Sequence, residues 1–403
     1  MSADSFTEVS SQNVFERLGN SFKNIIFGIV LFVASFPVLW LNEGRAVDRA
    51  KTLKQGADAF VAITADEVNP ENEGALVHVS GLATTSETLS DPDFNLSAPA
   101  IKLVRRVEMF QWIENVEEET KKKVGGGTET KRTVSYAKAW KSTTIQSSDF
   151  ENPQGHQNPG TMAYGSELQT ASDVTLGAFR LPAGTVGKIS GQKALPATDE
   201  ALTKLPAAEQ AKMKRTGATI YYGSDPGAPA IGDLKISFFE VPPAVISLVA
   251  KQLGSTFEPY RFKKGSIDLF QMGEAGPESM FEAAVSANRT LTWILRLVGF
   301  VLMAVGIGLT LGPLGVIGDI IPLVGSLVRT GTGIVAGLLA FVISMTTIAV
   351  AWLVYRPLLG ILLLAVAALG IVGLRTLSKR GGPDAAPVNE PPPQAPPPPP
   401  PGS

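Results

Sequence analysis

The chain has 403 residues, no cysteine, two histidines and a formal net charge of −2. Disulfides, thiol nucleophiles and cysteine zinc sites are therefore excluded, and two histidines are too few for a His-rich metal centre. The nearly balanced charge gives no general attraction to nucleic acid, so we expect no nucleic-acid partner. We also expect no metal and no cofactor.

The apolar residues are concentrated near the two ends of the chain, and this distribution predicts a membrane protein. A helix needs roughly 20 apolar residues to cross the hydrocarbon core of a bilayer. Residues 25–41 form the first such run, after a polar segment, 1–24, of which residues 1–20 are expected to be loose. The run lacks a small-x-small cleavage site, so we interpret it as an uncleaved signal anchor with Pro37 in its last turn.

Residues 42–288 are predicted to form a mainly-β domain outside the membrane. Alternating runs rich in β-branched and aromatic residues predict strands at 76–79, 102–114, 133–140, 218–222, 233–240, 245–252 and 266–272. The acidic run 117–119 and the basic run 121–123 precede three glycines, so we interpret them as a solvated hairpin tip rather than a binding patch. Helical spacing predicts a helix at 198–213.

The C-terminal part is predicted to cross the membrane three times. A helix starting at Pro277 is expected to continue unbroken into a span at 289–312. Residues 313–331 carry Asp319, and a charge at mid-bilayer costs several kcal/mol, so this piece is expected to be a surface or re-entrant segment. Further spans are predicted at 332–354 and 357–375, before a disordered proline-rich tail, 381–403.

The predicted fold class is thus an α+β membrane protein with four transmembrane helices, one N-terminal and three C-terminal. Arg17 and Lys23 before the first span, and the basic residues after the last, place both chain ends in the cytoplasm. The β domain would then lie in the periplasm or an organelle lumen. Arg45 and Arg49 on the far side count against this orientation, but long domains translocate largely regardless of charge.

Pairs of glycines four residues apart occur in two predicted spans, at Gly308 and Gly312 and at Gly333 and Gly337. Small residues at this spacing let helices approach closely. We expect these glycines to mediate packing among the C-terminal spans, with self-association as the alternative.

No catalytic motif is present: the sequence has no P-loop, no Gly-x-Ser-x-Gly elbow and no His-Glu-x-x-His. His156, in the segment 155–159, could serve a hydrolase as a base, but a histidine in this context is more often a turn residue. His78 alternates with valines and is expected to be a hydrogen-bonded sheet residue. No enzymatic activity and no small-molecule substrate are predicted.

Three charged positions have both a structural and a functional interpretation. Glu43 and Arg45 at the membrane boundary could form a functional ion pair or simply end a helix at the interface. Asp319 could line a pore or sense protons, or it could cap a short surface helix.

Seven segments, read in order, resemble the transmembrane protein 43 (LUMA) family. They are Asn42–Ala46, Glu71–His78, Leu89–Pro92, Arg106–Trp112, Gly155–Pro159, Gly232–Phe238 and Tyr355–Leu358, and together they cover about residues 20–375. The resemblance implies four spans with a large domain between the first and second. It also implies no established enzymatic activity and therefore no catalytic residues.

Eukaryotic members of this family lie in the endoplasmic reticulum and inner nuclear membrane. The resemblance also implies a role in organising protein complexes, with self-association and membrane-protein partners. Ion conductance and innate signalling are further roles that it suggests. The proline-rich tail and the alanine- and glycine-rich spans depart from animal members and are expected of a bacterial relative. The inner membrane would then be the location, and nuclear partners would not transfer.

Two functions therefore remain open. The first is a non-enzymatic scaffold that organises complexes at a membrane, with the bilayer, other membrane proteins or a second copy as partners. The alternative is an ion channel or ion-responsive signalling protein, with Asp319, Arg329 and Arg356 near the pathway. The candidate structural or interaction residues are Glu43, Arg45, Glu108, Trp112, His156, Asp233, Asp319, Arg356 and Pro357.

Overall fold

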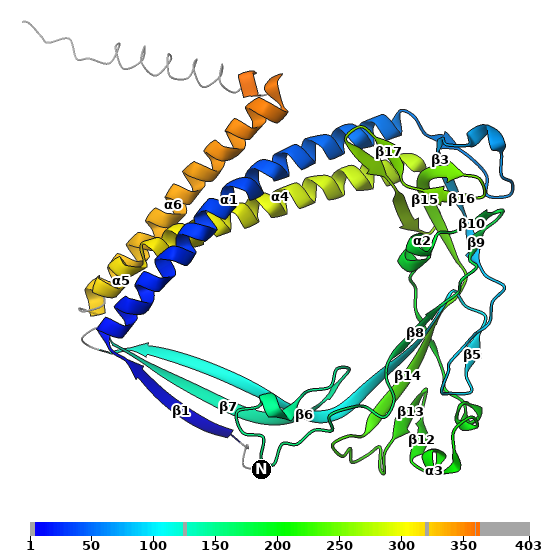
Figure 1. Cartoon of the computed structure of the whole chain (residues 1–403), viewed down its shortest axis with the longest axis horizontal. Coiled ribbons are helices and arrows are strands. Elements are labelled where there is room, and N and C mark those ends of the chain that lie inside the picture. Colours follow the sequence, from blue (N-terminus) through cyan, green and yellow to red (C-terminus); the bar gives the residue numbers. More distant parts are fainter. Residues whose placement is uncertain (1–4, 124–126, 319–321, 359, 363–403) are drawn as a thin grey trace, which may run out of the picture. The chain divides into compact units, whose positions relative to one another are not determined.

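The computed structural model describes residues 5–123, 127–318, 322–358 and 360–362. The chain divides into two compact units, 1–348 and 349–403, and each is considered by itself. The first unit contains two antiparallel helices and two β-sheets (Figure 1).

Helix α1 (Val14–Ala57) is a single helix of 44 residues that includes the whole first apolar run. Asn13 and Glu16 form a capping box: the Asn13 side chain accepts from the Glu16 amide at 2.9 Å, and the Glu16 carboxylate accepts from the Asn13 amide at 3.0 Å. Because α1 continues for about four turns beyond the apolar run, Pro37 lies in the interior of the helix and not in its last turn. An interior proline removes one backbone hydrogen bond, which helices in membranes tolerate.

Helix α4 (Pro277–Thr310) confirms the prediction of an unbroken helix that starts at Pro277 and enters an apolar run. It packs antiparallel against α1 along most of its length (Figure 1). The two backbones are in close contact at Gly28 and Gly306. The predicted pairs do not show the expected packing among the C-terminal spans: a Cβ at Gly308, Gly333 or Gly337 would meet nothing within 4 Å, and Gly312 faces Ser21 of α1.

Three helices are long and apolar enough to cross a membrane within the part of the chain that the structure describes. They are Phe15–Ala57, Pro277–Thr310 and Thr330–Tyr355. Between the second and third of these lies a short helix, α5 (Gly312–Gly318), and helix α6 (Pro322–Tyr355) starts ten residues earlier than the predicted span. Asp319 and most of the predicted fourth span, 357–375, lie outside the described residues.

The first sheet has the strand order β1-β7-β6-β14-β13-β12, with β8 pairing β6 and β11 pairing β14. Its strands are β1 (Ser5–Gln12), β6 (Lys102–Lys122), β7 (Thr128–Lys141), β8 (Glu167–Thr170), β11 (Lys193–Leu195), β12 (Met213–Thr216), β13 (Thr219–Tyr222) and β14 (Leu234–Val241).

The second sheet has the order β10-β9-β3-β15-β16, with β2 pairing β3 and β19 pairing β15. Its strands are β2 (Val61–Ala62), β3 (Leu76–Thr84), β9 (Thr175–Leu176), β10 (Phe179–Arg180), β15 (Ala244–Leu253), β16 (Thr256–Glu258) and β19 (Leu269–Met272). Two small pairs, β4 (Leu89–Ser90) with β5 (Ser97–Ala98) and β17 (Tyr260–Phe262) with β18 (Gly265–Ile267), complete the β structure described.

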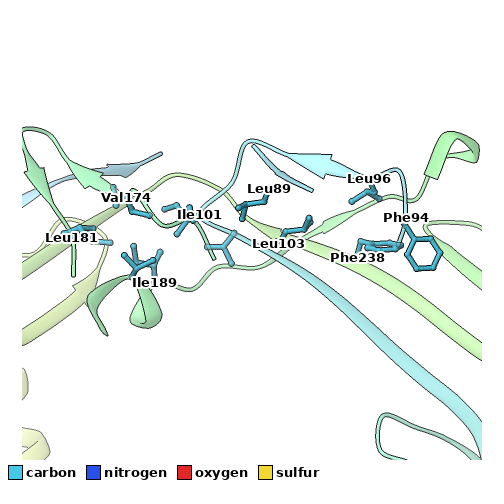
Figure 2. Close-up of a cluster of buried hydrophobic side chains, with 14 of the residues drawn as sticks. Leu89, Phe94, Leu96, Ile101, Leu103, Val174, Leu181, Ile189 and Phe238 are labelled. Atoms are coloured by element: carbon cyan, nitrogen blue, oxygen red, sulfur yellow. The ribbon is translucent and has the colours of Figure 1, made fainter. Parts of the chain in front are cut away.

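The main apolar core joins the two sheets. Val77 and Val79 come from the second sheet, and Val107 and Ile236 from the first, and all four are fully buried. Phe94, Leu96, Leu103 and Phe238 extend this cluster along the first sheet, as Figure 2 shows. The short helix α2 (Ala183–Lys188) and the following residue Ile189 cover one end of it. The strands thus bury one common core and form one domain.

The predicted hairpin is present as β6 and β7, but its strands are longer than predicted. β6 has 21 residues and continues through the acidic run into the basic run, which were predicted to be a hairpin tip. Their charges face opposite charges on β7, with Glu118 opposite Arg132 and Lys121 opposite Glu129. Such cross-strand pairs stabilise a ladder, which explains why the strands extend this far.

Residues 5–12 form strand β1 and are not the loose segment that was predicted. β1 pairs antiparallel with the outer half of β7, from Ser5 opposite Ser135 to Gln12 opposite Thr128 (Figure 1). Phe6 packs against a small cluster formed by Val134, Tyr136 and Phe150. The segment has only two large apolar residues, Phe6 and Val9, and it forms an edge strand because β7 has a free edge with which it can pair.

Two further predictions within the domain were wrong. The predicted helix at 198–213 is split into a 3-10 turn, Asp199–Leu202, the short helix α3 (Ala207–Gln210) and the start of β12, because Pro206 interrupts the helical hydrogen bonds. The predicted strand at 266–272 is divided at Asp268 into β18 and β19, which belong to different sheets.

Candidate functional site at the α1–α4 interface

Glu43 and Arg296 form a bidentate ion pair between α1 and α4, just beyond the first apolar run. Arg296 donates from Nε to Oε1 at 2.7 Å and from Nη2 to Oε2 at 3.0 Å. The Glu43 side chain is fully buried, and the Arg296 guanidinium also lies over the Trp293 ring at 4.8 Å. Arg45, the partner that the sequence suggested for Glu43, lies two residues away on the helix, where side chains do not face each other.

Arg45 belongs instead to a neutral hydrogen-bond network with three side chains. It donates to Asn288 Oδ1 at 2.9 Å, to Asn42 Oδ1 at 3.1 Å and to Thr292 Oγ1 at 3.0 Å. Asn42 donates to the Thr292 carbonyl at 3.0 Å, and Asn288 donates to the Ala46 carbonyl at 3.0 Å. We call Asn42, Glu43, Arg45, Asn288, Thr292 and Arg296 the polar clamp.

The polar clamp lies where the first apolar run ends on α1 and where the apolar run of α4 begins. A second apolar cluster follows it directly, in which Leu53 of α1 and Met280 and Phe281 of α4 pack on Leu76 and Val249 of the second sheet. Ser247 accepts a hydrogen bond from the Ala275 amide at 2.8 Å, so the segment before α4 is also fixed to the sheet. The helix pair is therefore joined to the domain by both polar and apolar contacts.

His78 contributes to the same junction. Its Nε2 donates to the Ala275 carbonyl at 2.9 Å, and its side chain is buried. The prediction of a hydrogen-bonded sheet histidine is therefore confirmed.

His156 is almost fully buried, with 1% of its surface exposed, beside the β6–β7 hairpin. Its Nδ1 donates to the Asn152 carbonyl at 2.9 Å, and its ring stacks on Tyr136 at 3.8 Å and meets the Trp112 ring edge-on at 4.8 Å. The nearby Ser147 hydroxyl donates to the backbone carbonyl of His156 and not to its ring. The two side chains therefore do not form a nucleophile–base pair, and the contacts are those of a turn histidine.

Trp112 is anchored from both sides of the strand. Asn158 accepts from its amide at 2.7 Å and donates to its carbonyl at 3.0 Å, and Lys138 Nζ lies 4.6 Å above the ring. Tyr136 donates to Glu114 Oε2 at 2.7 Å, and burial is the main cause that raises the pKa of its phenol. The predicted residues Trp112 and His156 are thus brought together and hold the loop 143–160 against the hairpin.

Asp233 closes a turn at the start of β14. Its carboxylate accepts from the Tyr221 hydroxyl and from the Ala230 amide. Burial and this hydrogen bond both raise the pKa of Tyr221 above its ordinary value. Gly223, which has φ +151°, leaves the space that the Asp233 carboxylate fills.

The remaining predicted residues do not join these clusters. Glu108 lies opposite Lys235 in the β6–β14 ladder. In the second unit, the Arg356 guanidinium lies 5.9 Å from the Trp352 ring centre, and Pro357 is exposed. No group of three or more His, Asp or Glu side chains suited to a metal occurs in the ranges that the structure describes.

A buried ion pair that was not among the candidates is formed by Arg105 and Asp91. The atoms Nη1 and Oδ1 are 2.6 Å apart, and the side chains are 4% and 2% exposed. Arg105 also pairs with Asp93 at 2.7 Å and lies 5.4 Å from the Phe94 ring centre. The alternation of β6 could have suggested that Arg105 faces inward. Its partner Asp91 could not have been predicted, because it lies in a loop without a periodic pattern.

Comparison with known proteins decides the family. The family model described as "Transmembrane protein 43" matches residues 109–357. Human transmembrane protein 43 is 34% identical over 92% of this chain and 94% of its own length. The chain belongs to the transmembrane protein 43 family.

Other family members show the same extent of similarity. The mouse protein is 34% identical over 90% of this chain and 92% of its own length, and a Drosophila melanogaster homologue is 32% identical over 88% and 94%. No solved structure matches the chain. The polar clamp and the β domain are therefore features of a transmembrane protein 43 family member with apolar helices of membrane-spanning length.

Proposed function

We propose that this transmembrane protein 43 family member is a non-enzymatic scaffold that organises protein complexes at a membrane. The observation that carries this proposal is the rigid junction between the domain and the helices. α4 continues from the sheet into its apolar run without a break, and the polar clamp ties it to α1 on the way. A protein bound to the domain can thus be held at a fixed distance from the bilayer.

The solvent face of the second sheet offers a surface for such a partner. Leu82 and Val245 lie opposite each other in the β3–β15 ladder, and they are 52% and 41% exposed. Adjacent exposed apolar side chains are favoured at protein interfaces. The partner would be another membrane protein or a second copy of the chain.

The topology that we propose has residues 1–24 in the cytoplasm and the β domain on the other side of the membrane, with four spans in total. The inner membrane of a bacterium is the location that fits the proline-rich tail. This arrangement is incompatible with the β1–β7 ladder in an inserted chain, because β1 precedes the first apolar run and β7 follows it. We infer that insertion of α1 separates the two strands.

The magnitudes favour insertion over the ladder. Ile26, Phe27, Val30 and Val33 are each more than half exposed on α1, and removing a large apolar side chain from water is worth about 1.5–3 kcal/mol. The β1–β7 ladder has eight cross-strand pairs at about 0.2–1 kcal/mol each, so it contributes roughly 2–8 kcal/mol, against roughly 6–12 kcal/mol for these four side chains.

The test combines native membranes and liposomes. A photo-crosslinking residue at Leu82 is expected to give a defined crosslinked product, identified by mass spectrometry, whereas one at the exposed Lys263 is expected to give none. Purified protein in liposomes should form stable oligomers or complexes without ion flux. Ion flux that is lost in Asp319→Asn would overturn the scaffold and favour the alternative, an ion channel or ion-responsive protein.

A further inference from the structure

A cavity of about 570 Å³ lies beside the polar clamp, on the side of the β domain. α1 and α4 form two of its walls, and the end of α2 and strand β19 form the others. Its charged lining consists of Arg45, Arg49, Lys188 and Asp268. Apart from Asn288, the α4 wall is apolar, and it includes Ala287 and Leu291, the residue at which the apolar run begins.

Only one of the three cations in this lining is neutralised. Lys188 Nζ lies 2.7 Å from Asp268 Oδ2. Arg45 donates only to the neutral groups of the polar clamp, and Arg49 donates to the Ser266 carbonyl at 2.6 Å. Within the described ranges, neither guanidinium has a carboxylate partner.

The two arginines also act on each other. Burial lowers the pKa of Arg49, and the positive charge of Arg45 lowers it further. In addition, Arg45 Nε is buried and has no hydrogen-bond partner within the described residues. Asp48, the acid between them in sequence, is paired with Lys264 at 3.0 Å. Two neighbouring cations without a carboxylate partner at one cavity favour binding of an anion with several oxygen atoms.

We propose that this cavity binds the phosphate group of an anionic membrane phospholipid, with Arg45 and Arg49 as its ligands. The position of the cavity selects a lipid: Leu291 and Ile294 are 43% and 51% exposed and continue from the cavity along the apolar run of α4. An acyl chain can follow this apolar path while the phosphate stays at the arginines. The volume is also within the range of about 300–1,000 Å³ that is usual for small-molecule sites.

The experiment uses the full-length protein purified in detergent. Dioctanoyl phosphatidylglycerol is titrated, and the apparent Kd is taken from the rise of the unfolding temperature with lipid concentration. Dioctanoyl phosphatidylcholine and glycerol phosphate are titrated in parallel arms. The variant Arg49→Gln removes one cation without touching the polar clamp. Arg289→Gln, an exposed arginine on α4 that does not line the cavity, is the matched control.

We expect phosphatidylglycerol to bind, Arg49→Gln to weaken it about tenfold, and Arg289→Gln to leave it unchanged. If Arg49→Gln and Arg289→Gln bound phosphatidylglycerol with equal affinity, the cavity would not be the binding site. Equal affinity of phosphatidylglycerol and glycerol phosphate would overturn the lipid as the ligand and leave a free phosphate ester in its place.

A second variant guards against loss of binding through misfolding. Asp268→Asn removes the only acid of the charged lining and frees Lys188, so we expect tighter binding of phosphatidylglycerol, by severalfold. Unchanged or weaker binding in this variant would contradict the proposal, because a loss of structure does not increase affinity.

Discussion

Gly28 of α1 and Gly306 of α4 bring the two helix backbones into direct contact. A Cβ atom at either position would lie 2.7 Å from the carbonyl oxygen of the other. At Gly306 the nearest atoms all belong to backbone, including the Phe32 amide nitrogen at 2.7 Å, so no side chain can move aside. This contact fixes how closely the helix pair packs, since there is no room for any side chain.

The first prediction follows from this contact. Gly306→Ala is expected to lower the stability of the helix pair by about 1–3 kcal/mol, the usual cost of overpacking, and to lower the unfolding temperature in detergent by several degrees. Gly308→Ala, two residues further on with nothing within 4 Å, is the control. It should be neutral or slightly stabilising, because alanine favours a helix over glycine. Equal shifts in both variants would contradict the close contact.

The second prediction concerns the ion pair of Glu43 and Arg296. Removing one partner leaves a buried charge alone, so Glu43→Gln is expected to destabilise the protein by about 3–5 kcal/mol. Asp48→Asn on the same helix breaks the exposed pair with Lys264 and should cost less than about 1 kcal/mol. Thermal unfolding of the purified variants measures both. A Glu43→Gln variant as stable as Asp48→Asn would show that the buried pair contributes little.

Some of these features could be predicted from the sequence, and others could not. The start of α4 at Pro277, the apolar runs and the long strands β3, β6, β7, β14 and β15 followed from composition and periodicity, which are local. The partner of Glu43 could not be predicted in this way, because Arg296 is 253 residues away in the chain. β1 was missed because Phe6 and Val9 are the only large apolar residues in its alternation, and its edge position depends on β7.

The third prediction concerns the topology, and the cysteine-free chain makes it simple to test. Single cysteines are placed at Thr7 and Thr133, whose hydroxyl oxygens lie 3.4 Å apart in the β1–β7 ladder. In sealed cells, a membrane-impermeant maleimide is expected to label the cysteine at position 133 from outside and the one at position 7 only after permeabilisation. Labelling of both cysteines from outside would place β1 and the β domain on the same side of the membrane. It would show that α1 does not cross the membrane completely.

The fourth prediction tests the core of the β domain. Asp91→Ala removes the buried partner of Arg105 and two backbone hydrogen bonds, to the amides of Asp93 and Phe94, so a loss of about 3–5 kcal/mol is expected. Asp93→Ala removes the partner that is 44% exposed, and a loss of about 1 kcal/mol or less is expected. Thermal unfolding, followed by the near-ultraviolet signal of the aromatic residues, distinguishes them. The prediction fails if the two losses are the same.

The part of α1 beyond the apolar run joins the β domain closely to the membrane. Residues 42–57 continue the helix beyond the apolar run, and at 1.5 Å per residue they span about 24 Å. α4 covers the same interval on its way from Pro277 to the membrane. Within that interval Asp48 pairs with Lys264, Arg49 donates to the Ser266 carbonyl and Leu53 packs on the second sheet, so the domain contacts the helix pair within about two turns of the apolar run. A change in bilayer thickness or surface charge therefore acts on the base of the domain through the polar clamp and these contacts.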